Sequence, residues 1–294
     1  MKRFISVAAI QMEILPLAVD ANLAKAELLI QNAVKAQKLD LVVLPEDCIT
    51  GPIPYNLEYS LDDTSDAVLF FRNLARKYKL YLVCGSFIKK REGKYFNTAL
   101  LIDRTGEIIL EYEKNNLWIP ERRYLAPGTN LPVVKTDIGT IGLTICWDLA
   151  SPNIFQTLAR QEADIICCPS YWTVEDAGLL IKKYPNVPIE ANLVDTLCAA
   201  RAMENEVLLI YANGAKKADL FLKSKKISHR QIGHSQICAA ILGSVKKIST
   251  NREGFVSYTY DRLIAKHAER NYKLRQDLAN GNTSKIPKAN NVVA

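Results

Sequence analysis

The chain has 294 residues, of which 49% are hydrophobic and 23% are charged, and its formal net charge at pH 7 is +7. These proportions are ordinary for a globular protein with a sizeable core, and no apolar stretch approaches the ~20 residues that a membrane-spanning helix needs. Lysine and arginine are spread along the chain without an aromatic-interleaved basic motif, so we expect neither nucleic acid nor a membrane as a partner. Residues 1–16 mimic a signal peptide, but Gln11 and Glu13 interrupt the apolar run early and favour a first strand of a cytoplasmic protein.

The seven cysteines and three histidines argue against disulfides and structural metal. The cysteine count is odd, and several cysteines lie inside apolar runs such as residues 81–87 and 163–170, which is typical of small buried side chains in a reducing compartment. The chain has no C-x-x-C motif, and His229, His234 and His267 are not spaced as metal ligands. We therefore expect neither a metal site nor a disulfide framework.

Short apolar segments alternate with amphipathic segments, and this pattern predicts an α/β fold. Strands are expected at residues 3–12, 39–46, 80–88, 95–103, 107–114, 133–146 (a hairpin), 163–170, 207–213, 234–242, 245–250 and 254–261. Helices are expected at residues 21–38, 65–79, 151–163 and 189–204, the third capped by Ser151 and opened by Pro152. Since no linker divides the chain, we expect one domain at residues 1–261 with two sheets and helices on their outer faces.

Two segments fit this alternation poorly. Residues 213–231 are long and basic for a connection between strands, so they form either a solvated loop, which we favour, or a lid that attracts an anionic substrate. Residues 262–294 are basic and then rich in asparagine, glycine and lysine, which predicts a C-terminal tail or an arm that contacts a partner.

Three reactive side chains directly follow predicted strands: Glu46, Lys114 and Cys146. Taken singly, the glutamate and the lysine could be surface charges and the cysteine could be core. However, residues at the ends of neighbouring strands are well placed to converge on one pocket. A helix N-terminus near Pro152 and a nearby lysine would both favour the Cys146 thiolate and lower its pKa. A cysteine, a lysine and a glutamate in one dry pocket suit acyl transfer through a thioester.

At this point the motifs resemble those of a known family. Residues 42–51 (VVLPEDCITG), 110–128 (LEYEKNNLWIPERRYLAPG) and 142–152 (GLTICWDLASP) are similar to the glutamate, lysine and cysteine motifs of the nitrilase superfamily, also called carbon–nitrogen hydrolases. Further segments match in order over roughly residues 4–261. The resemblance implies a four-layer αββα sandwich with two mixed sheets, assembled as a homodimer or larger homo-oligomer through the cysteine-side helices.

The resemblance also implies roles for individual residues. Cys146 would be the nucleophile, Glu46 the general base, and Lys114 the oxyanion donor with help from the Trp147 backbone N–H, while Glu121 would support the site. Residues bordering the substrate would include Trp147, Tyr171, Trp172 and Tyr55. The implied reaction is hydrolysis of a small linear amide or N-carbamoyl amine with release of ammonia, and it requires no cofactor.

Departures from the family pattern leave alternatives open. Asp148 after the Cys146–Trp147 pair favours an amide substrate, but a nitrile remains an alternative, as does a non-catalytic binding or scaffold protein that retains the fold. Asn153 replaces a glutamate that usually anchors the arginine matching Arg201, so this anchor is expected to be rebuilt. Residues 233–243 are altered, and Ser235 is expected to be structural because it lacks the Gly-x-Ser-x-Gly context of a nucleophile.

Overall fold

The computed structural model describes residues 2–54, 56–222 and 225–280, and within them the strands form two large mixed sheets and a separate hairpin. The first sheet has the order β10–β1–β2–β3–β4–β5, with β15 also paired to β1. Its strands are β1 (Phe4–Glu13), β2 (Leu41–Val43), β3 (Tyr81–Arg91), β4 (Lys94–Ile102), β5 (Ile108–Glu113), β10 (Gly214–Ala215) and β15 (Gly254–Asp261). β1, β2 and β3 are parallel, whereas β4, β5 and β15 pair antiparallel with their neighbours.

The second sheet has the order β14–β13–β9–β8–β7–β6. Its strands are β6 (Val133–Thr136), β7 (Gly139–Leu143), β8 (Ile165–Pro169), β9 (Leu208–Ala212), β13 (Gln236–Ala239) and β14 (Gly243–Lys247). β7, β8 and β9 are parallel. Because parallel strands need crossover connections, each sheet carries helices on one face.

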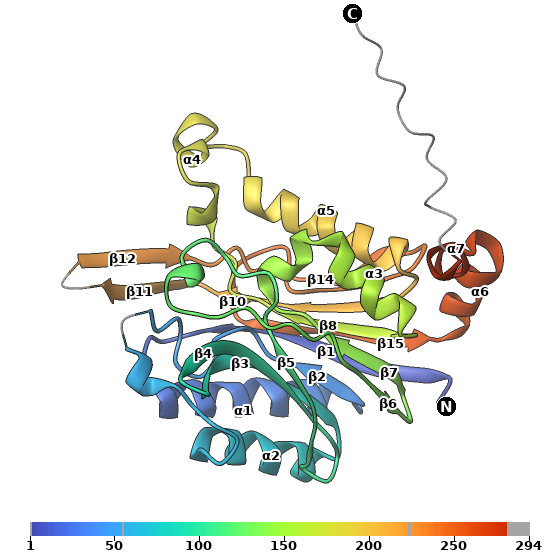
Figure 1. Ribbon diagram of the computed structural model, residues 1–294, viewed down its shortest axis with the longest axis horizontal. Helices are drawn as coiled ribbons and strands as arrows, with labels where there is room; N and C mark the ends of the chain where they lie inside the picture. The colour runs from blue at the N-terminus through green and yellow to red at the C-terminus, as the bar shows by residue number, and fades with distance from the viewer. Residues whose placement is uncertain (1, 55, 223–224, 281–294) are drawn as a thin grey trace, which may run out of the picture.

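The two sheets pack face to face between two layers of helices (Figure 1). Helices α1 (Val19–Ala36) and α2 (Asp66–Tyr78) cover the first sheet, and α3 (Pro152–Arg160) and α5 (Ile189–Glu204) cover the second. Pro152 opens α3 as expected, although the Ser151 side chain makes no capping hydrogen bond. This arrangement is the αββα sandwich expected from the sequence.

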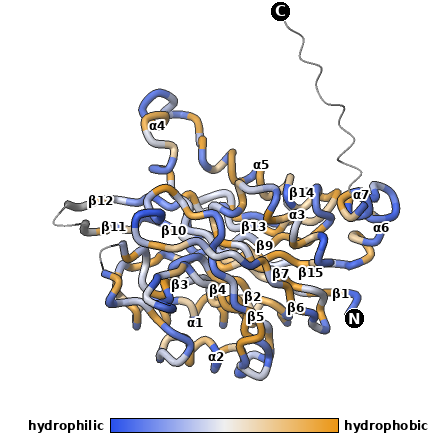
Figure 2. The backbone as a smooth tube through the Cα atoms, in the orientation of Figure 1, coloured by the Kyte–Doolittle hydropathy of each residue, from blue (hydrophilic) through white to orange (hydrophobic). Residues whose placement is uncertain are grey.

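The alternation of side chains along β1 shows how the layers are held together. Ile5, Val7 and Ala9 belong to the core between the sheets, whereas Ile10 and Met12 belong to the core beneath α1 and α2. Strand side chains point to opposite faces with a period of two, so a sheet buried on both sides reads as a continuous apolar run. Figure 2 shows these hydrophobic stretches concentrated in the strands of the two sheets, while α6 is largely hydrophilic.

Several elements were not expected from the sequence. They are the hairpin strands β11 (Lys217–Leu222) and β12 (Lys225–Arg230), the short helix α4 (Leu180–Lys183), the C-terminal helices α6 (Leu263–Tyr272) and α7 (Leu274–Ala279), and the 3-10 turns η1 (Leu57–Tyr59), η2 (Glu121–Arg123), η3 (Cys146–Ala150) and η4 (Val174–Ala177). Residues 263–279 are therefore helical and not loop-like. The rest of the predicted tail, residues 281–294, lies outside the described residues.

All seven cysteines are buried free thiols. None of the helices among the described residues has the length and apolar character needed to cross a bilayer.

Candidate active site

The site lies where strands of both sheets end. Glu46 follows β2, Lys114 follows β5, Cys146 follows β7 and Tyr171 follows β8. β2 and β8 come from different sheets, yet the backbone N–H of Glu46 donates to the Ser170 carbonyl at 3.2 Å. The strand ends of the two sheets therefore meet at one edge of the sandwich, which brings Glu46, Lys114, Cys146 and Glu121 to one cavity.

Lys114 is the charged centre of the site. Its side chain is 1% exposed, and its Nζ lies 2.9 Å from Glu46 Oε1 and 2.8 Å from Glu121 Oε2. Burial by itself would lower the pKa of Lys114, but the carboxylates of Glu121 and Glu46 outweigh it and hold the pKa well above its ordinary value. Lys114 is therefore a buried ammonium fixed between two carboxylates.

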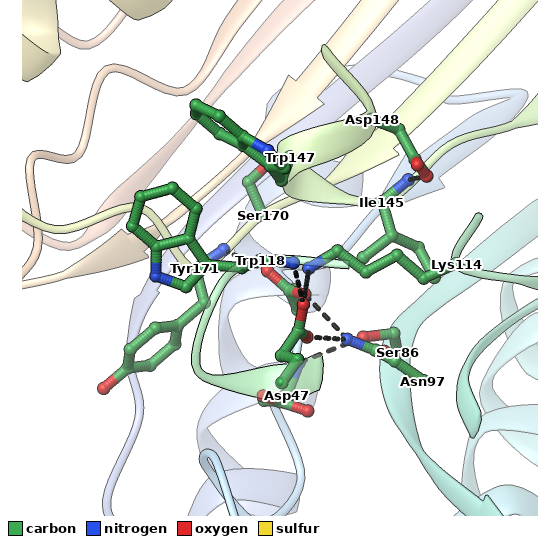
Figure 3. A network of polar contacts seen from close by, with 12 residues as sticks. Asp47, Ser86, Asn97, Lys114, Trp118, Ile145, Trp147, Asp148, Ser170 and Tyr171 are labelled. Atoms are coloured by element: carbon green, nitrogen blue, oxygen red, sulfur yellow. Dashed lines mark hydrogen bonds and ion pairs between the residues drawn. The ribbon is translucent and has the colours of Figure 1, made fainter. Parts of the chain in front are cut away.

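Further hydrogen bonds orient the two carboxylates. Asn97 Nδ2 donates to Glu46 Oε1 at 2.8 Å and to Glu121 Oε1 at 3.0 Å, and Figure 3 shows the side chains of Lys114 and Asn97 directed toward the same carboxyl groups. Backbone N–H groups complete the shell: Tyr171 donates to Glu46 Oε2 at 2.8 Å, and Trp118 donates to Glu121 Oε2 at 2.7 Å. Such charge-assisted donors restrict the rotation of both carboxyl groups.

Cys146 begins the turn η3 with an unfavourable backbone conformation. Its φ is +47°, a region that non-glycine residues rarely occupy without surrounding support. Asp148 supplies that support, because its carboxylate accepts hydrogen bonds from the backbone N–H groups of Ile145 and Asn116, both at 2.8 Å, and from the Tyr112 hydroxyl at 2.7 Å. The buried Asp148 thus fixes the turn that presents the thiol.

The expectation of a lowered Cys146 pKa is wrong. Burial raises the pKa of the thiol well above its ordinary value, Glu46 raises it further, and Lys114 offsets only part of the effect. Cys146 itself begins the 3-10 turn η3, and the helix α3 begins only at Pro152, six residues later. Cys146 is therefore a neutral thiol in the resting site, and the adjacent Glu46 carboxylate can accept its proton during attack.

A cavity of about 280 Å³ opens onto these groups and is rich in aromatic side chains. The Trp118 and Trp147 rings meet at 4.6 Å between centroids, and Trp147 and Trp172 meet at 5.4 Å. Trp147, Tyr171 and Trp172, expected to border the substrate, all line the cavity. Tyr55 lies outside the described residues.

Sequence reasoning missed several residues that line or support the cavity. Trp118, Tyr124, Asp47 and Asp176 line it, and Asn97 ties Glu46 to Glu121. Asp47 follows Glu46 directly, and Tyr124 and Trp118 flank Glu121, so proximity in sequence was the available signal for these three. Asn97 lies inside β4 and carries no such signal.

The basic segment 213–231 is not a solvated loop. It contains β10 and the antiparallel pair β11–β12, and its residues Leu220, Ile227 and His229 line the cavity. The hairpin is joined to η4 by an ion pair between Arg230 and Glu175 at 2.7 Å. Burial lowers the pKa of His229, so this wall of the cavity presents apolar and neutral groups near pH 7.

The surroundings of two departures from the family pattern, at position 153 and near Ser235, are visible in the hydrogen bonds of their neighbours. Arg201 donates from Nε to the Leu149 carbonyl at 3.0 Å and from Nη1 to Glu204 at 2.8 Å, so this buried guanidinium has partners without a glutamate at position 153. The Ser235 hydroxyl accepts from the Asn213 backbone N–H at 2.9 Å and does not line the catalytic cavity.

The comparison with known families decides the classification. The sequence profile of the carbon–nitrogen hydrolases matches residues 6–265, which is most of the chain. The chain belongs to the carbon–nitrogen hydrolase family. Among the described residues, no group of three or more histidine, cysteine or acidic side chains is arranged to hold a metal ion.

Proteins named as a nitrilase and as an amidase resemble this one over most of its length. A probable nitrilase from Schizosaccharomyces pombe is 26% identical, over 91% of this chain and 92% of the relative. A deaminated glutathione amidase from Dictyostelium discoideum is 31% identical, over 72% of this chain and 74% of the relative. The present protein is thus a C–N hydrolase whose relatives include proteins named for amides and for nitriles.

Solved carbon–nitrogen hydrolase structures share the fold. The enzyme from Helicobacter pylori G27 superposes with a TM-score of 0.82 at 23% identity, over 93% of this chain and 95% of that chain. A glutamate variant of the amidase from Nesterenkonia sp. AN1 superposes with a TM-score of 0.74 at 20% identity, over 93% of this chain and 96% of that chain. In that variant the acetamide moiety of fluoroacetamide is covalently added at the active-site cysteine.

Proposed function

We propose that this hydrolase is a thiol amidase that cleaves a small linear amide or N-carbamoyl amine through a thioester on Cys146, releasing ammonia. The observation that carries the proposal is the buried Lys114 ammonium, held between Glu46 and Glu121 in the cavity that also contains Cys146. A fixed cation beside a nucleophile in a water-poor pocket is suited to stabilising an oxyanion.

In the first half-reaction, Glu46 takes the proton of the Cys146 thiol as Sγ attacks the carbonyl carbon. The carbonyl oxygen becomes an oxyanion stabilised by Lys114 Nζ and by the Trp147 backbone N–H, which lies in the first turn of η3, where N–H groups have no partner within the helix. Collapse of the tetrahedral intermediate breaks the C–N bond. The nitrogen leaves as ammonia after receiving the proton from Glu46.

In the second half-reaction, Glu46 removes a proton from water, and the resulting hydroxide attacks the thioester carbon. The same donors stabilise the second oxyanion. The C–S bond then breaks, Sγ regains a proton, and the acid or carbamic acid leaves. Glu121 supports both steps as a positioning residue, because it holds Lys114 and shares Asn97 with Glu46.

A product analysis tests this proposal. Wild type and Cys146→Ala would be incubated with linear amides, N-carbamoyl amines and nitriles, and ammonia and organic products would be measured. We expect wild type alone to release ammonia from an amide or carbamoyl compound. Acid formed from a nitrile but from no amide would favour the nitrilase alternative, and equal release by both proteins would overturn the cysteine mechanism.

We also propose that the enzyme is a homodimer or larger homo-oligomer and that the segment 262–294 takes part in its contacts. The exposed apolar side chains of Leu179, Leu180 and Tyr184 near α4 support a contact on the α5 side of the sandwich. Sedimentation equilibrium of the full chain and of Leu179→Lys tests the assembly, since a monomer at micromolar concentration in the wild type would contradict it.

A further inference from the structure

We propose that the cavity contains a cation-binding subsite centred on Asp47, and that the substrate is a linear amide or N-carbamoyl compound with a terminal ammonium group. The substrate class rests on the proposed amide hydrolysis. The subsite itself rests on the geometry and charge of the cavity.

Asp47 is a buried carboxylate without a protein partner on one of its oxygens. The residue lines the cavity and is 6% exposed, and its Oδ1 is buried without a hydrogen bond from the described residues. Its backbone has φ +52°, and the ion pairs of Lys114 are with Glu46 and Glu121. Figure 3 shows the Asp47 carboxyl group directed away from the Lys114 ammonium. A buried acceptor that lacks a donor, on a residue that lines a cavity, marks a place where a ligand donor can be accommodated.

The charges that line the cavity favour a cation. The described lining residues include four acidic side chains, those of Glu46, Asp47, Glu121 and Asp176, against the single permanent cation Lys114. Burial raises the pKa of Asp47 and raises that of Asp176 to about 6, so a bound cation would favour the ionised forms of both. Lys114 is already paired with Glu46 and Glu121. A substrate carboxylate would therefore meet repulsion without a free counter-charge among the described lining residues, whereas an ammonium would be attracted.

Two tyrosines complete the surroundings of Asp47. Tyr124 and Tyr171 line the same cavity as Asp47, and burial, followed by the Asp47 charge, raises the pKa of both phenols. The Tyr171 hydroxyl is also buried without a hydrogen-bond partner from the described residues. Phenol oxygens accept hydrogen bonds from an ammonium, and aromatic ring faces attract cations, so these groups suit the same ligand.

A bound ammonium would also offset the cost of burying the charge of Asp47. Burial raises the pKa of Asp47 well above its ordinary value, and the neighbouring Glu46 and Glu121 raise it further. Burying a charge without a partner is costly, whereas a partner of opposite charge offsets that cost and favours the ionised carboxylate. Because Asp47 adjoins Glu46 in sequence, an ammonium held there leaves the other end of a short substrate within the cavity of Cys146.

Binding and turnover of three probes of similar length test the subsite: 4-aminobutanamide (cationic), pentanamide (neutral) and succinamic acid (anionic). Calorimetry with Cys146→Ala measures binding without turnover. We expect 4-aminobutanamide to bind about tenfold or more tightly than pentanamide, and succinamic acid most weakly. We expect the same order in wild-type kcat/KM.

Asp47→Asn in the Cys146→Ala background is the decisive variant, because it removes the charge and keeps the shape. The preference for the cationic over the neutral probe should fall toward one, while the matched change Asp20→Asn on exposed α1 should leave it unaltered. Equal affinities of the cationic and neutral probes, or a preference that survives Asp47→Asn, would overturn the subsite. If cation-selective binding depends on Asp47 but wild type hydrolyses no amide, the subsite stands and the proposed reaction fails.

Discussion

At the scale of single residues, Lys114 illustrates how a buried charge becomes useful. The two carboxylates that hold it cancel the cost of burial and fix the ammonium before substrate arrives. A donor that is already oriented needs no reorganisation when the oxyanion forms. The same arrangement makes the residue structurally important, because its loss leaves two buried carboxylates without their cation.

We predict that Lys114→Ala lowers kcat by about 10²- to 10³-fold or more and lowers the free energy of unfolding by about 3–5 kcal/mol. Steady-state kinetics and urea unfolding measure the two effects. Lys94→Ala, which changes an exposed lysine of β4, is the control and should alter neither. A Lys114→Ala enzyme with wild-type kcat would contradict the oxyanion role.

The raised pKa of Cys146 predicts a distinct pH dependence. Because a raised pKa keeps the thiol protonated, the thiolate fraction is small at pH 7 and increases as pH rises beyond 9. Modification of Cys146 by methyl methanethiosulfonate, followed by peptide mass spectrometry, should therefore accelerate with pH up to at least about pH 9, with no plateau near neutrality. A plateau at or below pH 7 would show that the resting enzyme holds a thiolate.

The candidate catalytic residues were easier to predict than the residues that position them. Glu46, Lys114 and Cys146 stand in motifs at strand ends, Glu121 lies seven residues beyond Lys114 in the same motif, and the structure brings all four to one cavity. Asn97 could not be found this way, because an asparagine inside a strand looks like any polar residue until the order of β2, β3 and β4 in the sheet is known. The raised pKa of Cys146 could not be predicted from the sequence either, since burial and the distance to Glu46 are tertiary properties.

At the scale of elements, the turn η3 depends on one buried carboxylate. Asp148 accepts three hydrogen bonds, two of them from backbone groups on either side of the site. We predict that Asp148→Ala lowers the free energy of unfolding by roughly 1–3 kcal/mol for each buried donor left unpaired, and lowers kcat/KM because Cys146 loses its support. Urea unfolding and kinetics test this. Asp20→Ala on the exposed face of α1 is the control, and an Asp148→Ala protein as stable as that control would contradict the account.

Strands and long helices followed from apolar spacing, but the hairpin β11–β12 did not. Its lysines suggest a solvated loop, although Ala218 and Leu220 alternate with charged neighbours and are both buried. That alternation was visible in the sequence, whereas the cavity that the hairpin covers was not. Helix α6 was missed for a related reason, because its composition is mostly polar.

At the scale of the whole molecule, the C-terminal helices are fastened to the second sheet by Arg275. Its guanidinium donates to the carbonyls of Asn205 at 3.0 Å, Glu206 at 3.2 Å and Ala163. Arg160 of α3 also donates to the Leu278 carbonyl at 3.3 Å. These contacts explain why residues 263–279 are ordered against the sandwich, which composition alone did not indicate.

We predict that Arg275→Ala lowers the free energy of unfolding by about 1–3 kcal/mol, because the carbonyls lose a charged donor. Calorimetry should show a fall in Tm, while kcat/KM at low temperature stays unchanged because Arg275 is remote from the cavity. Arg270→Ala, at an exposed position of α6, is the control. A Tm equal to that of the control would contradict the fastening role.

The packing of the two sheets was predicted only through family resemblance. Periodicity indicates that both faces of β1 are buried, but it does not identify which element covers each face. The face-to-face arrangement then creates the site, since Glu46 comes from one sheet and Cys146 from the other.

The most direct test of the central claim is detection of the acyl-enzyme. Wild type would be mixed with a hydrolysed amide, quenched in acid within the first turnover and digested for mass spectrometry. We predict that the peptide containing Cys146 gains the mass of the acyl group, and that the gain is absent in Cys146→Ala. Turnover without any acyl group on Cys146, or with an acyl group on another residue, would contradict the proposed mechanism.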